Sequence, residues 1–371
     1  MTARVLGVDG GQTSTKMVIA NLEGEVIWSA QVASAFSGLD DAGASLTAGG
    51  LERRLRELLQ QTLSEPLHAR PEPAEGACPE PVEGIRPERV EGTGRIFEMA
   101  VLGMSGAEPG SPLIGGFQAA VTGAVPARRY RVVHDAVTNL LGASAGQPGI
   151  VVIAGGGAVA YGVGEDGRSW AAGGWGYAVG DEGSGYSIGR AAINAVFRAL
   201  DGRDVPTQLV EPLLQHFDVS GAVELKYAIF EGRVQFQDIA ALPPLVAQLA
   251  AAGDGTARRI LRGAGCDLAE AAVAVARSLD LLAAPVKVYL TGGLRRETRY
   301  LLPAFQEAIL KTLPGALFPQ PAFEPVIGTL FLAYRDLGRP IDDRLLRNLS
   351  ESWARMRPAG FGEQGQILPL T

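Results

Sequence analysis

A glycine turn near the N-terminus carries the first residues that could do chemistry. Residues 9–16 read DGGQTSTK and follow a short apolar run at 4–8. Glycine lets a backbone approach a ligand closely, and consecutive exposed amides form a cradle for an anion. The candidate phosphate ligands are Gly10, Gly11, Gln12, Thr13, Thr15 and Lys16. Asp9 is a candidate magnesium ligand through water, because hard cations prefer carboxylate and water oxygens. A solvated hairpin turn is the simpler interpretation of this segment when it is taken alone.

A second glycine turn lies between the strand-like runs 149–154 and 158–163. It consists of Gly155, Gly156 and Gly157. Its letters also fit a dinucleotide-binding fingerprint, but that fingerprint requires a helix to begin at the glycines. Since a strand-like run follows instead, the pattern favours a second phosphate-binding hairpin.

A third glycine pair, Gly292 and Gly293, follows the apolar run 286–290. Such a pair is more often a packing turn than a ligand site. Three glycine turns in this order are nevertheless less expected by chance, so we include this pair among the candidate nucleotide contacts.

Asp135 follows the strand-like run 129–133 and begins a predicted helix over 135–145. An Asp at this position is ordinarily a helix cap. The functional hypothesis is a general base. Since an Asp has a reference pKa near 4, much of its work would be to orient the attacking hydroxyl. We expect the preceding His134 to be a packing neighbour.

A glycine-dense segment at 173–185 could hold a sugar. Trp175 offers an apolar face for sugar C–H groups, and the acidic pair Asp181 and Glu182 offers acceptors for sugar hydroxyls. Trp175, Asp181 and Glu182 are therefore candidate substrate contacts. A flexible loop with Ser184 as a helix cap is the alternative.

The elements that position these residues form two similar series. Strands are expected at 4–8, 16–20 and 25–30, and again at 149–154, 158–163 and 168–170. Further strands are expected at 96–102, 129–133 and 286–290. Helices are expected at 51–63, 135–145, 184–200, 205–217, 235–251, 256–279, 298–312, 326–337 and 341–355. The repeated series predicts a duplicated α/β fold with a cleft between its halves.

We expect an N-terminal domain over 1–140, a C-terminal domain over 141–324, and helices over 325–371 that return to the first domain. An eight-residue repeat, RPEPAEGA-CPEPVEGI-RPERVEGT, occupies 70–93. It carries too little apolar surface to fold alone, so it is predicted to be a disordered insertion.

Composition excludes several function classes. The chain has 371 residues, with 33 Lys and Arg against 40 Asp and Glu, so its net charge of −7 argues against nucleic acid as a partner. Two Cys and three His leave little for a disulfide framework or a zinc site. No Lys follows a Gly, which excludes a P-loop. Residues 140–164 are uncharged, but Pro148 and eight glycines favour a buried strand and a turn over a membrane span. A cytoplasmic protein is expected.

With these residues in view, the chain resembles the N-acetylglucosamine kinase-like members of the BadF/BadG/BcrA/BcrD ATPase family, within the actin/hexokinase superfamily. The most specific segment is GGWGYAVGDEGSGYSIGR at 173–190. The resemblance implies two ribonuclease H-like domains. It implies phosphate loops in DGGQTSTK and GGGA, an adenosine motif in TGGL, a catalytic Asp135, and a sugar site lined by Trp175, Gly176 and Asp181.

Three positions depart from the family pattern. Gly156 and Ala158 stand where the family usually has Thr and Ser, which leaves only backbone donors for the phosphates. His134 stands where the family has Asn. The sugar-contacting Asn has no clear match in 34–43, where Ser37 or Asp40 could substitute.

The resemblance implies an ATP- and Mg²⁺-dependent kinase that phosphorylates an amino sugar, N-acetylglucosamine or glucosamine, at the 6-hydroxyl. ATP and the amino sugar are the expected partners, with no nucleic acid and no membrane, and a homodimer stays open. One alternative is a BadF/BcrA-type ATPase activator, which needs cysteines for an iron–sulfur cluster. The other is a sugar- or nucleotide-binding sensor with weakened catalysis.

Overall fold

The computed structural model describes residues 3–11, 14–33, 53, 56–57, 97–297 and 299–357. The chain divides into two compact units. The first unit comprises Met1–Thr138 and Pro325–Thr371, and the second comprises Asn139–Glu324. The eight-residue repeat and most of the helix expected at 51–63 lie outside the described residues.

A five-stranded sheet forms the centre of the first unit, with the strand order β3-β2-β1-β4-β5. Strands β1, β2 and β3 are antiparallel neighbours, whereas β4 runs parallel to both β1 and β5. The strands are β1 (Arg4–Gly10), β2 (Ser14–Asn21), β3 (Val26–Ala33), β4 (Phe97–Met104) and β5 (Ala127–His134).

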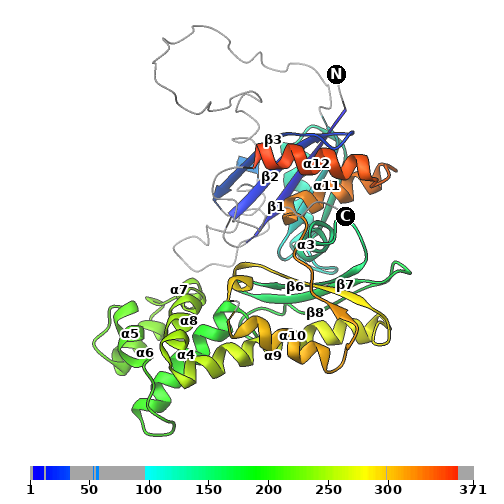
Figure 1. Cartoon of the computed structure of the whole chain (residues 1–371). Coiled ribbons are helices and arrows are strands. Elements are labelled where there is room, and N and C mark those ends of the chain that lie inside the picture. The colour runs from blue at the N-terminus through cyan, green and yellow to red at the C-terminus, as the bar shows by residue number, and fades with distance from the viewer. Residues whose placement is uncertain are drawn as a thin grey trace, which may run out of the picture. The chain divides into compact units, whose positions relative to one another are not determined.

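Helices cover both faces of this sheet. On one face α2 (Ile114–Ala124) packs on a buried apolar core. That core includes Leu6, Val8, Met17, Leu102, Met104, Phe117 and Val121. On the other face lies α11 (Pro325–Asp336), and the first turn of α3 (Asp135–Ala143) approaches the same face at Gly103. Helix α12 (Asp343–Met356) packs on β3. Figure 1 shows α11 and α12, from the C-terminal end of the chain, beside the strands from its N-terminal end.

The second unit repeats the strand arrangement of the first. Its sheet has the order β10-β9-β6-β7-β8, in which β6, β7 and β8 are antiparallel and β9 runs parallel to both β6 and β10. The strands are β6 (Gly149–Ala154), β7 (Ala158–Val163), β8 (Ser169–Gly173), β9 (Val286–Thr291) and β10 (Ala316–Leu317). The prediction of a duplicated α/β fold is therefore confirmed.

Most helices of the second unit lie on one face of its sheet. The long helix α9 packs on β6, β7 and β8 and against α10, as Figure 1 shows. The helices are α4 (Gly185–Leu200), α5 (Val210–His216), α6 (Ala222–Phe230), α7 (Phe236–Ala240), α8 (Pro243–Ala252), α9 (Gly255–Ser278) and α10 (Leu301–Leu310), with a 3₁₀ turn, η1 (Gly293–Arg296). The opposite face packs against Leu140 and Ala143 of α3.

The helices of the structure differ from the expected ones at a few places. The helix expected at 235–251 is two helices, α7 and α8, because Pro243 and Pro244 occupy the first turn of α8 and cannot continue a preceding helix. Helices α2 and α6 were not expected from the sequence. Residues 140–164 form the end of α3, then β6, the glycine turn and β7, as predicted, and no helix in the described part of the chain could cross a membrane.

Gly103 allows α3 to approach the sheet closely. A Cβ at this position in β4 would lie 2.4 Å from Oγ1 and 2.8 Å from Cγ2 of Thr138 in α3. We therefore expect Gly103→Ala to lower the free energy of unfolding by roughly 1–3 kcal/mol, which urea titration would measure. Adding Thr138→Ala should recover part of the loss, because it removes both colliding atoms.

Gly115→Ala in α2 is the matched control, since a Cβ there meets nothing within 4 Å. Alanine should be neutral or stabilising by up to about 1 kcal/mol at this helical position. A Gly103→Ala variant as stable as Gly115→Ala would contradict the close packing of α3 on β4.

Candidate active site

The predicted catalytic and metal-binding residues of the first unit lie at one edge of its sheet. Because β1, β4 and β5 are parallel, their carboxyl ends meet at the same edge. Asp9 is paired with Gly103, and Gly103 with the strand position just before His134. Asp135 follows at the first position of α3. The fold therefore gathers residues from distant parts of the chain.

Ser105 links two groups at this edge, and it is not among the residues predicted from the sequence. Its hydroxyl donates a hydrogen bond of 2.6 Å to Oδ2 of Asp135. Its backbone amide donates to the carbonyl of Gly10, at 3.3 Å, in the first glycine turn. Ser105 thus links the candidate base to the candidate phosphate hairpin. A polar residue directly after a central parallel strand was the available signal.

The surroundings of Asp135 argue against a simple capping role. The amide of Ala136 donates to Nδ1 of His134 at 3.2 Å, so the imidazole takes a hydrogen bond that a capping carboxylate could have taken. Nδ1 also lies 3.2 Å from Oδ1 of Asp135, so the imidazole lies directly beside the carboxylate. The Asp135 side chain remains 16% exposed.

Asp9 and Lys16 are cross-strand partners in β1 and β2, so their side chains lie on the same face of the sheet. Asp9 is buried, at 9% exposure. Burial raises the pKa of Asp9 to about 7; the positive charge of Lys16 opposes this shift, and the negative charge of Asp135 adds to it. A further positive charge beside Asp9 would therefore lower its pKa and favour the ionised carboxylate.

This donor set fits a magnesium ion held mainly by other ligands. No group of three or more His, Cys, Asp or Glu side chains among the described residues could enclose a metal. Magnesium, however, commonly binds proteins through one or two carboxylates and completes its shell with water and substrate phosphates. A divalent cation beside Asp9 would also offset the burial that raises its pKa.

The second glycine turn is a hairpin, in which β6 and β7 pair up to Ala154 and Ala158. The carbonyls of Gly155 and Gly156 accept hydrogen bonds of 2.8 and 3.2 Å from the first two amides of α4. Within the described ranges, the amides of Gly156 and Gly157 have no protein acceptor. These amides can therefore donate to an anion.

Asp181 fixes this hairpin to the tryptophan loop, which we define as residues 174–180. Its side chain accepts hydrogen bonds from the backbone amides of Ala158 and Gly176. A Cβ on Gly157 would lie 2.8 Å from its Oδ2. Asp181 is buried, with a left-handed φ of 59°, and its burial raises its pKa despite these bonds. Because a carboxylate has about four acceptor sites, a ligand hydroxyl could also donate to Asp181.

Trp175, in the tryptophan loop, is 78% exposed. Its indole is therefore accessible for stacking on a sugar face. Gly292 lies against the end of β6, because a Cβ there would come within 2.3 Å of the Ala154 carbonyl, and its φ is +84°. The structure of the second unit thus brings all three predicted groups, the hairpin, the sugar loop and the Gly292-Gly293 turn, close to β6 and β7.

Some predicted residues receive no support from the structure. Gln12 and Thr13 lie outside the described residues, as do Ser37 and Asp40. Thr15 is fully buried in β2, and the alternation of the strand directs it away from the face that carries Lys16. A phosphate contact by Thr15 remains a prediction.

Comparison with known proteins adds a family and two kinds of relative. The model of the BadF/BadG/BcrA/BcrD ATPase family matches residues 6–333. An N-acetylmuramic acid/N-acetylglucosamine kinase of Clostridium acetobutylicum is 28% identical over 333 residues, which is 89% of this chain and 97% of the relative.

Solved structures show the same similarity. A chain from Chromobacterium violaceum, proposed to be an N-acetylglucosamine kinase, has 29% identity and a TM-score of 0.64, and the match covers 89% of this chain and 99% of that one. A ROK family glucokinase from Streptomyces griseus, in complex with glucose and AMPPNP, has 16% identity and a TM-score of 0.50 over 90% of this chain and all of that one. The predicted hexokinase-type fold is confirmed by these likenesses.

The raised pKa of Asp9 predicts a pH-dependent stability in the absence of nucleotide and magnesium. The folded state holds the Asp9 proton up to about pH 7, whereas the ordinary pKa of an Asp side chain is 3.8. The contribution of Asp9 to stability is therefore highest at low pH and falls as the pH rises from about 4 to about 7. Asp9→Asn should raise the thermal midpoint by a few degrees at pH 8 and have little effect at pH 4.

Asp280→Asn, at a surface carboxylate with 79% side-chain exposure, is the matched control and should show no such pH-dependent gain. A lower midpoint for Asp9→Asn than for the unmodified protein at pH 8 would show that the ionised carboxylate stabilises the fold.

Proposed function

Since this chain belongs to the BadF/BadG/BcrA/BcrD ATPase family, we propose that it is an ATP-dependent kinase that transfers a phosphoryl group to a hydroxyl of an amino sugar. The observation that carries the proposal is the Ser105–Asp135 pair at the carboxyl ends of β4 and β5, next to Asp9 and the first glycine hairpin. A carboxylate held in place beside a phosphate loop is what phosphoryl transfer requires.

Asp135 has the role of base in this reaction. The sugar oxygen attacks the γ-phosphorus of ATP, the bond from that phosphorus to the bridging oxygen of ADP breaks, and the hydroxyl proton passes to the Asp135 carboxylate. Ser105 donates to Oδ2 and so holds the carboxylate in place while it takes the proton. Orientation of the hydroxyl contributes most, because an Asp carboxylate is a weak base.

Backbone amides and one ammonium group bind the ATP phosphates. In the second unit the proposed donors are the amides of Gly156 and Gly157. In the first unit Lys16 is the proposed donor, beside Gly10 and Gly11, and the Gly11 amide is itself bonded to the Ser14 carbonyl. Asp9 would hold Mg²⁺, which neutralises phosphate charge when it is bound. Gln12, Thr13, Thr15, Gly155, Gly292 and Gly293 complete the proposed nucleotide contacts.

The proposed acceptor is N-acetylglucosamine or glucosamine, phosphorylated at the 6-hydroxyl. The relative from Clostridium acetobutylicum bears the name of a kinase of two N-acetylated amino sugars, which supports this class. Trp175 would stack on the sugar, while Gly176 and Asp181 would accept or position its polar groups. A cytoplasmic location, where ATP is available, is part of the proposal.

A sensor with weakened catalysis is the second candidate, and Gly156 and Ala158 favour it. They replace residues that carry hydroxyl groups in most of the family, and each hydrogen bond to a charged phosphate lost in this way is worth about 1.5–3 kcal/mol.

For the third alternative, an iron–sulfur activator, the structure offers only Cys266 among the described residues, exposed on α9. A lone cysteine does not provide a cluster site.

A coupled ATP-consumption assay with glucosamine, N-acetylglucosamine, N-acetylmuramic acid and glucose tests the proposal. We expect the highest kcat/KM for one of the amino sugars. Asp135→Asn should lower kcat at least 100-fold, since the base is removed, while ATP binding measured by calorimetry stays within about threefold. Sugar binding without turnover in the unmodified protein would favour the sensor, and near-normal turnover in Asp135→Asn would remove the base assignment.

Ser105 acts on the reaction through Asp135, so we expect Ser105→Ala to lower kcat about tenfold to 100-fold and to leave KM for ATP nearly unchanged. This range matches the loss of one hydrogen bond to a carboxylate. Ser105→Thr, which keeps the hydroxyl, should recover most of the rate.

Ser111→Ala, in the same loop, is the control, because its hydroxyl only accepts from the amide of Leu113. Equal kcat values for Ser105→Ala and Ser111→Ala would show that Ser105 does not position the base.

A further inference from the structure

An arginine-lined cavity lies in the second unit, on the outer side of α4. Its volume is about 490 Å³, and it is bounded by α4, the first turns of α9 and the segment between α4 and α5. Its polar lining includes Arg190, Asn194, Arg198, Asp204, Thr256 and Arg259. We call this cavity the arginine pocket.

The helical spacing sets one wall of the pocket. Arg190, Asn194 and Arg198 follow one another at intervals of four residues, so they share one face of α4. Thr256 and Arg259 lie three residues apart on α9, and the Arg259 guanidinium donates to the Thr256 hydroxyl at 2.9 Å. Two helices thus present guanidinium groups to the same space.

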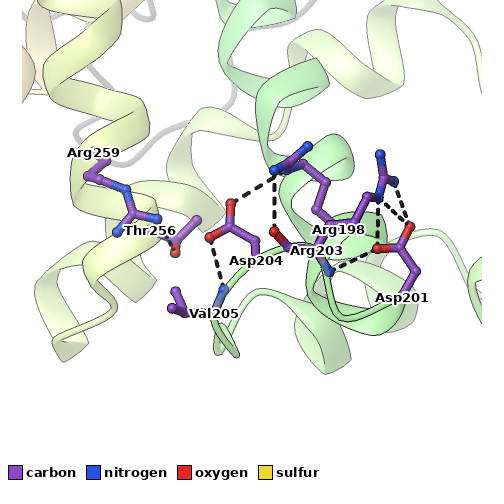
Figure 2. A network of polar contacts seen from close by, with 7 residues as sticks. All are labelled: Arg198, Asp201, Arg203, Asp204, Val205, Thr256 and Arg259. Atoms are coloured by element: carbon purple, nitrogen blue, oxygen red, sulfur yellow. Dashed lines mark hydrogen bonds and ion pairs between the residues drawn. The ribbon is translucent and has the colours of Figure 1, made fainter.

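Arg198 is held in position by its neighbours, as Figure 2 shows. Its side chain lies 3.5 Å from Oδ2 of Asp204 and donates to the carbonyl of Arg203 at 3.4 Å. The guanidinium of Arg203 pairs with Asp201, at 2.6 Å, and does not line the pocket. This arrangement fixes one guanidinium before any ligand arrives.

The pocket carries excess positive charge. The amide of Val205, with Arg198 and Arg259, lowers the pKa of Asp204, so this carboxylate is ionised. Three guanidinium groups therefore face one carboxylate, which leaves a net charge of about +2 in the lining. Arg190 has neither a hydrogen bond nor an ion pair to any residue in the part of the chain that the structure describes.

This chemistry suits a phosphate group on a small polar molecule. Guanidinium groups bind phosphate oxygens with paired N–H donors, more specifically than a point charge does. The volume lies within the usual range for small-molecule sites. Asn194, Thr256 and the acceptor oxygens of Asp204 can bind hydroxyl groups on the remainder of the ligand.

The end of the pocket at Arg198 lies far from the phosphate hairpin of the same unit, whereas Ser187 and Arg190 line the end nearer to the start of α4. Helix α4 begins at Gly185, whose amide bonds to Gly155 of the hairpin. Arg198 lies thirteen residues further along α4, which at 1.5 Å per residue is about 20 Å. A phosphate bound by the hairpin amides therefore does not reach Arg198.

We propose that the arginine pocket is a second anion site, which binds a small phosphorylated molecule that also bears hydroxyl groups. A sugar phosphate, the product class of the proposed kinase, has this chemistry; that choice of ligand, and only that choice, rests on the proposed function. Arg190, Arg198 and Arg259 bind the phosphate, and the occupied pocket ties α4 to the first turns of α9.

Equilibrium dialysis of the full chain tests this site, with radiolabelled inorganic phosphate and N-acetylglucosamine 6-phosphate as probes. A non-hydrolysable ATP analogue and N-acetylglucosamine are kept in excess, so that the proposed active site is filled. We expect saturable binding that weakens at least tenfold in the Arg190→Ala/Arg259→Ala variant. Arg259→Lys should weaken phosphate binding less than the double variant does, because a lysine keeps the positive charge and loses only the paired N–H donors of the guanidinium.

Arg203→Ala is the matched control, since this neighbouring arginine is committed to Asp201 and lies outside the pocket lining. Its affinity for both probes should be unchanged. The substituted arginines are exposed, so each variant should keep its thermal midpoint within about 2 °C.

The results separate this inference from the proposed function. Equal binding by the double variant and Arg203→Ala, or no binding at all, would overturn the site. The double variant could instead keep its phosphate binding and show a different mass in sedimentation. That result would also overturn the anion site and would identify a surface that contacts another protein chain. Phosphate binding through these arginines in a chain that phosphorylates no sugar would support the site and count only against the kinase. The ratio of the two affinities distinguishes a sugar phosphate from free phosphate as the ligand.

Discussion

The parallel pairing of β4 with both β1 and β5 is the constraint on which the first unit depends. It places the ends of three strands in one row, so that Asp9, Ser105 and Asp135 meet although they are far apart in sequence. The pairing works only because helices can lie very close to the sheet. Gly7 leaves room for Thr329 of α11, and Gly103 leaves room for Thr138 of α3. A side chain at either position would push a helix outward and move the start of α3 away from the strand ends.

The two units share the same hairpin, but its residues differ in charge between them. In the first unit the hairpin carries side chains with charge, Asp9 and Lys16, on one face. In the second unit it carries only glycines and Ala158, so its chemistry comes from the main chain. Backbone amides bind an anion through fixed geometry rather than through charge. The duplicated topology therefore supplies one charged hairpin and one neutral one.

Much of this fold could be predicted from the sequence, because hairpins and glycine turns leave local signals. Alternating apolar runs on both sides of Gly155–Gly157 were sufficient to distinguish a hairpin from a helix start. Helix α6 gave no such signal, since Val223, Tyr227 and Phe230 are exposed and its apolar residues do not mark a single buried face. Helix α2 has two adjacent glycines in its first turn, and glycine is a weak helix former.

The candidate site was predictable only where a single residue stands out by its type and its place after a strand. Asp135 and Asp9 follow strands and are acidic, so their positions were visible in the sequence. Ser105 was missed because its importance comes from partners that lie elsewhere in the chain. The surroundings of Asp181 could not be predicted for the same reason. Its carboxylate lies beside the backbone amides of Ala158 and Gly176, and no side-chain pattern marks them.

That one carboxylate of Asp181 also has a mechanical consequence. It grips Ala158 at the foot of the hairpin and Gly176 beside the exposed indole of Trp175. If the tryptophan loop moved to cover a bound sugar, it would also displace Asp181, which lies against the glycine hairpin. A displacement of the tryptophan loop would therefore also strain the hairpin, and no helix lies between the two in this linkage.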